Sequence, residues 1–328
     1  MRALASALGW PFEVRRLSFV GWELLLHALP RPTLRGVDLH ASDALAPPWP
    51  DVVITAGRRN ELPARWIRAN SGKPVTLVHV GRPWSSPDHF DVVISNAQYA
   101  LAPSARVLVN ELPLNDVRAD ALAAARQASE PRFAAWPRPR TVVLLGGNSG
   151  PFVLTPERGR ALGRLLSAFV ARHGGSVLAS DSPRTPPGVL DAVVSELRSD
   201  AFVNRFADGA NAYRDLLATA DRFVVTADSV SMLTEASATA RPVFLFDPRR
   251  RSLARALDAW RWRPLVDVAT RTIGPKRMRR DVAALERALV ADGAWRYFDA
   301  DATPFTPSRV PGADDLARAV ARVRARVN

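Results

Sequence analysis

The sequence contains no cysteine, only five histidines and no long apolar run, and each shortage excludes certain kinds of site or protein. Without cysteine there is neither a disulfide framework nor a thiolate metal site. The histidines are not closely paired, so we expect no dedicated zinc site and no resident cofactor. No run reaches the roughly 20 apolar residues that a membrane-spanning helix needs, and no cleavable signal is evident. We therefore expect an intracellular, cytoplasmic protein.

The length and composition indicate a globular protein. A chain of 328 residues can bury one large core or two ordinary ones, and two domains are the better expectation. The hydrophobic fraction of 47%, with glycine and proline scattered along the chain, is typical of a soluble α/β protein.

The net charge of +13 comes almost entirely from arginine, because Lys73 and Lys276 are the only lysines. Such a charge attracts phosphate-rich partners: nucleotides, anionic lipid surfaces or nucleic acid. A nucleic-acid binder usually gathers its charge into runs interleaved with exposed aromatic residues. The densest basic groups, at 249–251 and 276–280, instead flank predicted helices. Nucleotides and an anionic membrane surface are therefore the expected partners, and nucleic acid is not.

Two series of alternating strands and helices predict two βαβ domains. The first occupies residues 1–130 and the second occupies residues 141–328, with the final helices packing back. Between them, residues 131–140 carry three prolines and are interpreted as a linker. The predicted strands are 12–17, 51–55, 75–80, 91–95, 107–109, 141–145, 176–179, 201–204, 223–225 and 242–246. The predicted helices are 4–8, 61 to about 70, 115–129, 156–173, 187–198, 212–220, 281–291 and 314–327.

One apolar segment near the start allows two interpretations. Residues 19–29 form either an amphipathic segment with Trp22 at a membrane interface or a helix packed on its own domain. Ordinary burial statistics favour the packed helix.

The most informative stretch is 224–246, which predicts a strand, a polar turn, a helix and a further strand. In a parallel sheet, ligands bind at the carboxyl ends of the strands, where helix N-termini present N–H groups. Asp228, Ser229 and Ser231 fall at that edge, and Glu235 lies four residues after Ser231 on the same helical face. A carboxylate there can accept hydrogen bonds from ribose hydroxyls while the helix end holds a diphosphate. The stretch predicts a nucleotide site.

A glycine-rich turn follows the first strand of the second domain. Glycine at a strand end lets backbone N–H groups approach an anion, and Gly146, Gly147, Asn148 and Ser149 are placed to do so. The turn fits neither the Walker loop nor the dinucleotide fingerprint. In a doubly wound sheet it shares one edge with the turn at Asp228, and the two turns can bind one ligand.

This pair of turns resembles the nucleotide-sugar half of GT-B glycosyltransferases. It is similar to the peptidoglycan enzyme that transfers N-acetylglucosamine to lipid I, although Ala240 replaces a glycine and Asp228-Ser229 replaces Ser-Gly. The resemblance implies two Rossmann-like domains facing a cleft. It places Glu235 on the ribose, Asp228, Ser229 and Ser231 near the diphosphate or sugar, and the glycine turn on the phosphates.

A longer series of segments resembles the family named for the plant elongated-mitochondria, or mitochondrial fission, protein. These segments are 51–59, 90–94, 146–147 with 152–155, 182–186, 211–213 and 224–236. Bacterial members of that family are described as nucleoside-diphosphate-sugar enzymes. The chain departs from the family at Ala212, where a proline is usual, and it begins after the family's usual first strand and loop.

Transfer of a sugar requires stabilisation of the departing diphosphate and a base for the acceptor hydroxyl. Arg184 in the second domain and Gly57, Arg58 and Arg59 at a turn of the first are the candidates for phosphate and acceptor binding. In GT-B enzymes helix ends and basic side chains stabilise the leaving group, so no metal is implied. The base is not identified by the sequence; the candidates are His79, Asp88 and His89, which surround the loop after the strand at 75–80.

These features lead to three hypotheses. The first is a metal-independent GT-B-type glycosyltransferase that uses a nucleotide-diphosphate sugar on a lipid-linked or envelope glycan, at the inner face of the membrane. The second is a non-catalytic peripheral membrane adaptor that retains a nucleotide site. The third is a nucleotide-sugar epimerase, since that chemistry also occurs on GT-B-like folds.

Overall fold

The computed structural model of the protein describes residues 1–21, 26, 31–99, 101–148, 153–209, 212–246 and 281–327, and they form two compact units. The first unit contains Met1–Leu114 and Gly312–Asn328, together with a short segment that ends at Asp281. The second contains the described residues of 115–246 and 282–311. Both units are mixed α/β and built on parallel sheets, which confirms the predicted fold class. The cleft between two domains stays a prediction.

The first unit is built on a four-stranded sheet whose strands follow one another in chain order, as β3-β4-β5-β6. Its strands are parallel throughout and are β3 (Val52–Ala56), β4 (Thr76–Val80), β5 (Val92–Asn96) and β6 (Val107–Asn110). A small antiparallel pair, β1 (Ser18–Phe19) with β2 (Val37–Asp38), precedes the sheet. The predicted strand at 12–17 is wrong, because these residues belong to no strand, and the side chains of residues 11–16 are exposed.

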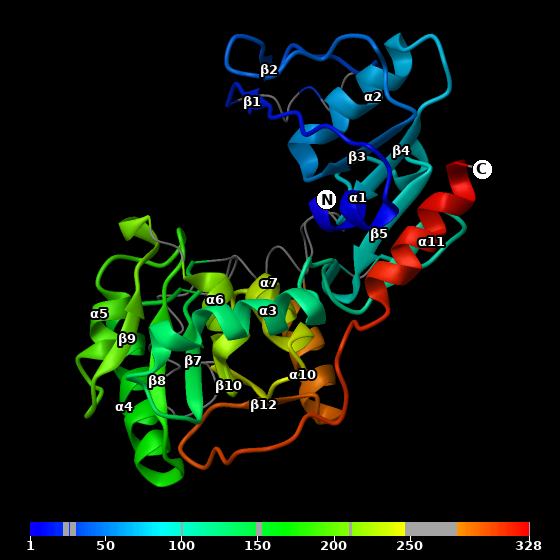
Figure 1. The fold of residues 1–328 in the computed structure, drawn as a ribbon. Helices are drawn as coiled ribbons and strands as arrows, with labels where there is room; N and C mark the ends of the chain where they lie inside the picture. The colour runs from blue at the N-terminus through cyan, green and yellow to red at the C-terminus, as the bar shows by residue number, and fades with distance from the viewer. Residues whose placement is uncertain are drawn as a thin grey trace. The chain divides into compact units, whose positions relative to one another are not determined.

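Helices cover both faces of this sheet (Figure 1). Helix α2 (Glu61–Asn70) packs on one face, where Leu77 and Val93 are fully buried. Helices α1 (Arg2–Leu8) and α11 (Asp315–Val327) lie side by side on the other face. The apolar side chains of Leu316, Val320 and Val323 in α11 join this core, while Val327 is 36% exposed.

The start of α11 is fastened to the end of β6 by one carboxylate. Asp315 is 5% exposed, and its Oδ2 accepts a hydrogen bond from the N–H of Leu112 at 2.8 Å. Its Oδ1 accepts from the N–H of Glu111 at 3.2 Å, and Asn110 Nδ2 donates to its backbone oxygen. Burial raises the pKa of Asp315, and the two N–H donors oppose that rise.

Replacing Asp315 with asparagine is expected to lower the free energy of unfolding of the first unit by about 1–2 kcal/mol. An amide has one acceptor oxygen in place of two, so a buried N–H of the β6 loop loses its partner. The adjacent Asp314 is exposed, and Asp314→Asn is the matched control. Urea unfolding of the two variants measures the difference, and equal stabilities would contradict the role given to Asp315.

The second unit is built on a six-stranded parallel sheet in the order β12-β11-β10-β7-β8-β9. Its strands are β7 (Arg140–Leu144), β8 (Ser176–Ser180), β9 (Ala201–Asn204), β10 (Arg222–Thr226), β11 (Val243–Phe246) and β12 (Trp295–Tyr297). Counted along the chain, this is the order 3-2-1-4-5-6 of the doubly wound Rossmann fold. The short strand β12 is absent from the sequence-based prediction because three residues carry too little periodicity to be recognised.

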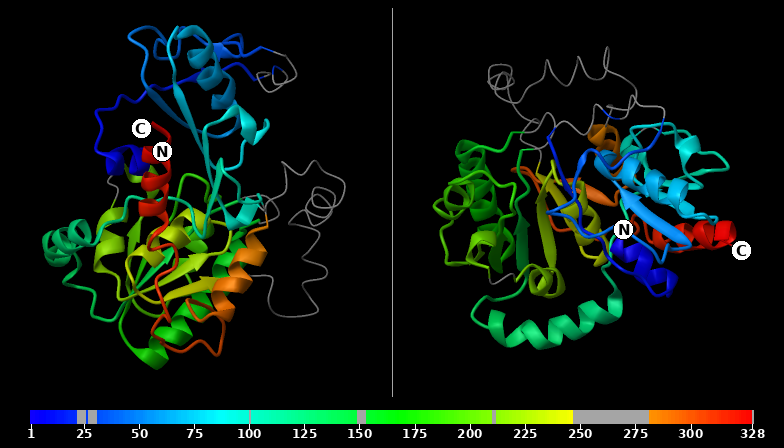
Figure 2. Two further views of the ribbon diagram at one scale, coloured as in Figure 1. Left: turned by 90° about the vertical axis from the view of Figure 1, so that its right-hand side faces the viewer. Right: turned by 90° about the horizontal axis from the view of Figure 1, so that it is seen from above.

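Helices again cover both faces, as Figure 2 shows from two further directions. Helices α4 (Pro156–His173) and α5 (Val189–Val194) pack together over β7 and β8. On the other face α6 (Tyr213–Thr219) contacts β7, and α7 (Val230–Ala238) contacts β10 and β11. Among the described residues of this unit, two further helices are α3 (Ala119–Ser129), which packs on α6, and α10 (Val282–Ala291).

Local signals explain why the longest helix begins and ends where it does. Thr155 has extended backbone angles, and its hydroxyl accepts a hydrogen bond from the N–H of Arg158, while proline occupies the first helical position. The helix ends at Gly174, whose φ of 70° suits glycine. By contrast, α5 is shorter than the predicted helix at 187–198. Two prolines and Gly188 precede α5, and the residues that follow it within the predicted range do not continue the helix.

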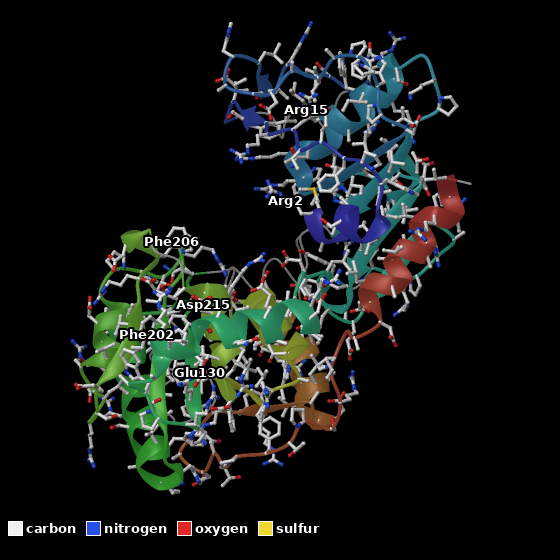
Figure 3. The ribbon with its side chains drawn as sticks, viewed as in Figure 1. Arg2, Arg15, Glu130, Phe202, Phe206 and Asp215 are labelled. Carbon is white, nitrogen blue, oxygen red and sulfur yellow. The ribbon has the colours of Figure 1, made fainter. Side chains whose placement is uncertain are left out.

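The proline-rich segment 131–140 is not a linker, and it forms part of the second unit. Phe133 is fully buried, with its ring centroid 5.0 Å from that of Phe202. The buried guanidinium of Arg140 donates to the backbone oxygens of Phe133 and Trp136 at 2.8 and 3.0 Å. Arg132 also forms an ion pair at 3.2 Å with Asp215, a residue of the second unit that is labelled in Figure 3. The boundary between the units therefore falls at Leu114 in place of 130, and α11 belongs to the first unit.

Candidate functional site

The sheet of the second unit has one point at which the order of its strands reverses, between β7 and β10. Leu144 of β7 is paired with Val225 of β10, so the loops that follow both strands begin at the same edge. In open α/β sheets, ligands bind in the crevice outside the carboxyl ends of the strands at such a reversal. This is the place to which the sequence assigned a nucleotide.

The two loops meet through direct hydrogen bonds. The N–H of Gly146 donates to Thr226 Oγ1 at 2.8 Å, and the N–H of Gly147 donates to Asp228 Oδ2 at 2.7 Å. The prediction that the two turns share one edge is confirmed. The amides expected to approach phosphate are, however, already bonded to the protein's own side chains.

Close packing explains why both positions are glycine. A Cβ on Gly146 would lie 2.3 Å from Asp228 Oδ2, and a Cβ on Gly147 would lie 1.9 Å from the backbone oxygen of Arg184. Neither distance is compatible with a side chain. Both glycines are therefore required for the two loops to pack together. The sequence alone does not distinguish this requirement from a role in binding phosphate.

A third loop, after β8, is fastened to the glycine turn. Ser182 Oγ donates to the backbone oxygen of Gly146 at 3.0 Å, and Thr185 Oγ1 donates to that of Leu145 at 2.9 Å. These bonds hold Arg184 at the site. Its Nη2 donates to Ser229 Oγ at 3.2 Å and lies 3.7 Å from Asp228 Oδ2. The Arg184 side chain is 47% exposed, so it can be reached by a ligand.

Asp228 is the most buried charged group of the site, at 4% exposure. Burial raises its pKa, while the hydrogen bonds from Gly147 and Thr226 and the charge of Arg184 oppose that rise. Ser229 beside it is also buried, whereas Ser231, in the first turn of α7, is exposed. Of these three predicted residues, only Ser231 faces solvent directly.

Glu235 is half-buried and has a partner that the sequence reasoning did not assign. Tyr213, the first residue of α6, donates its hydroxyl to Glu235 Oε2 at 2.5 Å. Burial raises the pKa of Glu235, and it raises the pKa of the Tyr213 phenol as well. The carboxylate predicted to hold a ribose is therefore at the site but hydrogen-bonded to a phenol. Tyr213 belongs to the segment 211–213, which resembles the mitochondrial fission family. That resemblance was the only sequence signal that could have pointed to Tyr213.

The remaining part of the glycine turn is partly described. Asn148 Oδ1 accepts a hydrogen bond from the N–H of Leu154 at 3.0 Å, which closes the loop before α4. Ser149 lies outside the described residues. Thr226, Ser182 and Thr185 contribute to the site but were not singled out, since hydroxyl residues at strand ends are common and only the pairing of strands brings them together.

The predicted acceptor-side residues lie at the carboxyl edge of the first unit's sheet. Gly57 has a φ of 75°, a conformation that favours glycine, and it turns the chain from β3 toward α2. Arg58 and Arg59 follow it and are exposed. The guanidinium of Arg58 lies 5.6 Å from the ring centroid of Trp84, which comes from the loop after β4.

A buried carboxylate that the sequence reasoning missed holds that loop in place. Glu61, in the first turn of α2, is fully buried and accepts hydrogen bonds from the backbone N–H groups of Trp84 and Ser85. The hydroxyl of Ser85 also donates to it, at 2.7 Å. Three donors satisfy the carboxylate, which is what burial of a charge requires.

His79, a predicted candidate for the catalytic base, is fully buried within β4. Neither ring nitrogen has a hydrogen-bond partner, and the ring lies 4.9 Å from that of Phe90. Burial lowers the pKa of His79 to about 4, although the charge of Glu61 opposes this effect. From this position the imidazole cannot reach an acceptor hydroxyl, so its proposed role as a surface base is wrong. Strand alternation placed it on the α2 face.

The other two base candidates lie after β4 in the same unit. Asp88 is exposed and accepts a hydrogen bond from Ser86 Oγ at 2.9 Å. His89 is half-buried; partial burial and the charge of Arg65 lower its pKa. Both side chains are more accessible than His79, and their catalytic role stays a prediction.

No cluster of three or more histidine, aspartate or glutamate residues able to hold a metal ion occurs within the described ranges. Among the helices of that same part of the chain, none is long and apolar enough to cross a membrane. The segment predicted at 19–29 lies mostly outside the described residues.

Comparison with known families identifies the lineage of this chain. The model of the family described as "Mitochondrial fission ELM1" matches residues 1–327. The chain belongs to this family. The resemblance inferred from the separate segments is thereby confirmed over nearly the whole sequence.

Two relatives show how far the similarity to individual proteins extends. The chain is 28% identical over 279 residues to the Arabidopsis thaliana "Mitochondrial fission protein ELM1", covering 72% of this chain and 64% of that protein. It is 23% identical over 235 residues to "Uncharacterized protein RP120" of Rickettsia prowazekii, covering 61% and 65% respectively. The matched region thus spans less than two thirds of either relative.

Solved structures with a related arrangement include glycosyltransferases. A glycosyltransferase from Rickettsia africae is 12% identical, with a TM-score of 0.39, covering 84% of this chain and 76% of that one. MurG of Acinetobacter baumannii is 11% identical, with a TM-score of 0.38, covering 84% and 65%. At scores below 0.5 this likeness carries no inference about activity or substrate.

Proposed function

We propose that the second unit binds a nucleoside-diphosphate sugar at the carboxyl edge of its sheet, and that the protein is a GT-B-type glycosyltransferase. The supporting observation is the meeting of three loops at the point where strand order reverses. Those loops present Arg184 and the first turn of α7 at a single edge, and Glu235 follows in the next turn of the same helix. This combination suits a ligand that carries both a diphosphate and a ribose.

Each group has a chemical role in this proposal. Arg184 and the N–H groups at the start of α7 stabilise the negative charge that develops on the departing diphosphate. Glu235 accepts hydrogen bonds from the ribose hydroxyls after Tyr213 has released it. Basic side chain and helix end together supply this stabilisation, so we propose that no metal ion is required.

We assign the acceptor to the first unit, where Arg58 and Arg59 are exposed beyond the end of β3. Two guanidinium groups suit an acceptor that carries phosphate, such as a lipid-linked or envelope glycan. The base for the acceptor hydroxyl is sought at Asp88 or His89. Action at the inner face of the membrane, by peripheral association of a basic protein, completes the proposal.

A second candidate function is a non-catalytic adaptor that retains the architecture of the site. One observation favours it: the hydrogen-bonding groups of the site are engaged with one another, Gly147 with Asp228 and Tyr213 with Glu235. An adaptor needs these contacts for stability alone. The first function requires nucleotide binding, whereas an adaptor that keeps only the architecture does not.

Thermal unfolding in the presence of uridine, guanosine, cytidine and adenosine diphosphates tests the site. One of them is expected to stabilise the protein, by about 2.7 kcal/mol at a concentration of 100 times Kd. Glu235→Gln is expected to remove most of that stabilisation, because a neutral amide cannot accept from both ribose hydroxyls.

Glu196→Gln is the matched control, since Glu196 belongs to the same unit and forms an exposed ion pair with Arg164. It should respond to the nucleotide as the unaltered protein does. Absence of a shift with all four diphosphates would reject the nucleotide site and favour the adaptor.

A further inference from the structure

The position of Asp228 narrows the kind of ligand that the proposed site can accept. Its carboxylate lies against Gly146, with Oδ2 and Oδ1 only 2.3 and 2.6 Å from the place of a Cβ on that residue. The same Oδ2 accepts the N–H of Gly147 at 2.7 Å. The carboxylate of Asp228 thus already occupies the place in the glycine turn where an anionic ligand would bind.

The other side of the turn is closed as well. The backbone oxygen of Arg184 lies 1.9 Å from the place of a Cβ on Gly147, so backbone packs directly against the Cα of this glycine. Ser182 and Thr185 hold that backbone in place by hydrogen bonds to the oxygens of Gly146 and Leu145. A phosphate therefore has neither a vacant N–H donor nor space at Gly147.

Among the described residues, the cationic group that forms an ion pair with this carboxylate is more accessible than the carboxylate itself. Arg184 Nη2 is 3.7 Å from Asp228 Oδ2, and the side chain is 47% exposed, against 4% for Asp228. A ligand approaching from solvent meets the guanidinium first. The ligand also experiences the negative charge of Asp228 behind that guanidinium. This charge repels a phosphate group, and the repulsion grows with each additional negative charge on the ligand.

We propose that the Asp228 carboxylate is the resident anion of the glycine turn, and that it directs the ligand's phosphate to Arg184, off the amides of Gly146 and Gly147. Asp228 is then a specificity-determining residue that lowers affinity for a highly charged diphosphate. The inference rests on the proposed nucleotide site and refines it, because it fixes where the phosphate binds.

Binding of inorganic pyrophosphate and uridine diphosphate to ¹⁵N-labelled protein tests this inference. In the unaltered protein, ligand is expected to shift the Arg184 side-chain resonance and to leave the Gly147 amide unchanged. Asp228→Asn retains an oxygen that can accept the Gly147 N–H but removes the charge, so pyrophosphate should bind about tenfold more tightly or better. Asp228→Ala opens the turn, and its Gly147 amide should shift on binding.

Asp191→Asn is the matched control, because Asp191 is an exposed carboxylate of the same unit that pairs with Arg205. It should bind pyrophosphate as the unaltered protein does. Weaker binding by Asp228→Asn would overturn the inference, since the carboxylate would then itself be a ligand contact. A shift of the Gly147 amide in the unaltered protein would overturn it too, because the phosphate would then displace Asp228.

The proposed nucleotide site and the proposed role of Asp228 can be rejected independently of each other. If neither probe binds any variant, the proposed function fails. The resident anion is then judged without ligand, from the amide proton of Gly147. A charged acceptor shifts that proton downfield, so Asp228→Asn must move it upfield; an unchanged resonance overturns the inference.

Discussion

Replacing Gly147 with alanine is expected to lower the free energy of unfolding of the second unit by about 3 kcal/mol. The new methyl group would lie 1.9 Å from the backbone oxygen of Arg184, and that backbone is fastened at Ser182 and Thr185. A flexible side chain could rotate away, but here the loop itself must move. The shift should also break the bond between the Gly147 amide and Asp228.

Urea unfolding, monitored through the exchange of amide hydrogens in β7 and β8, measures this decrease in the free energy of unfolding. Gly21→Ala serves as the control, because Gly21 has no atom near its Cβ position and no unusual φ. Its effect should stay within about 0.5 kcal/mol. If Gly147→Ala unfolded at the same urea concentration as the unaltered protein, the close contact between the loops would be contradicted.

Lowering the pH from 7 to 4 is expected to destabilise the first unit by about 3 kcal/mol through His79 alone. The ordinary pKa of 6.5 applies to the unfolded chain, and burial lowers it to about 4 in the folded state. The unfolded state therefore binds more protons in this interval, so stability is complete above pH 6.5 and is lost as the pH falls toward 4. The 2.5 units between these values, at 1.36 kcal/mol each, give the estimate of about 3 kcal/mol.

The free energy of unfolding, measured at several pH values for the unaltered protein and for His79→Gln, isolates this contribution. Glutamine does not titrate, so the variant should lose about 3 kcal/mol less than the unaltered protein over the interval. His40→Gln, which removes an exposed histidine of the same unit, is the control and should retain the full dependence. Parallel curves for all three proteins would show that His79 is not buried as described.

Most strands of both sheets could be predicted from the sequence because the signals are local. Apolar runs such as Val52–Ala56 and Arg222–Thr226 are rich in β-branched residues and end in polar turns. The alternation of strands with helices indicated parallel sheets, and the shared edge of the two turns followed from that topology. The prediction of Gly146 and Asp228 as neighbours rests on this general rule.

The details that failed depend on contacts between distant residues. Gly147 and Asp228 are 81 positions apart, and no local pattern indicates that one donates to the other. The three prolines of 131–140 are typical of a linker, yet Phe133 is buried against Phe202. His79 was a candidate base because it lies beside the loop that follows the strand at 75–80, whereas its side of β4 is covered by α2.

The position of α11 has a consequence for the way the protein acquires its structure during synthesis. Arg324 donates to the backbone oxygen of Leu8, 316 positions earlier in the chain, and Ala319 and Val323 occupy the same core as Leu4. On a ribosome, all strands and helices of the second unit emerge before this helix does. The second unit can therefore fold before α11 has emerged, whereas the first must wait with an exposed apolar face until that helix is available. Chaperones that bind nascent chains are expected to recognise the amino-terminal segment during that delay.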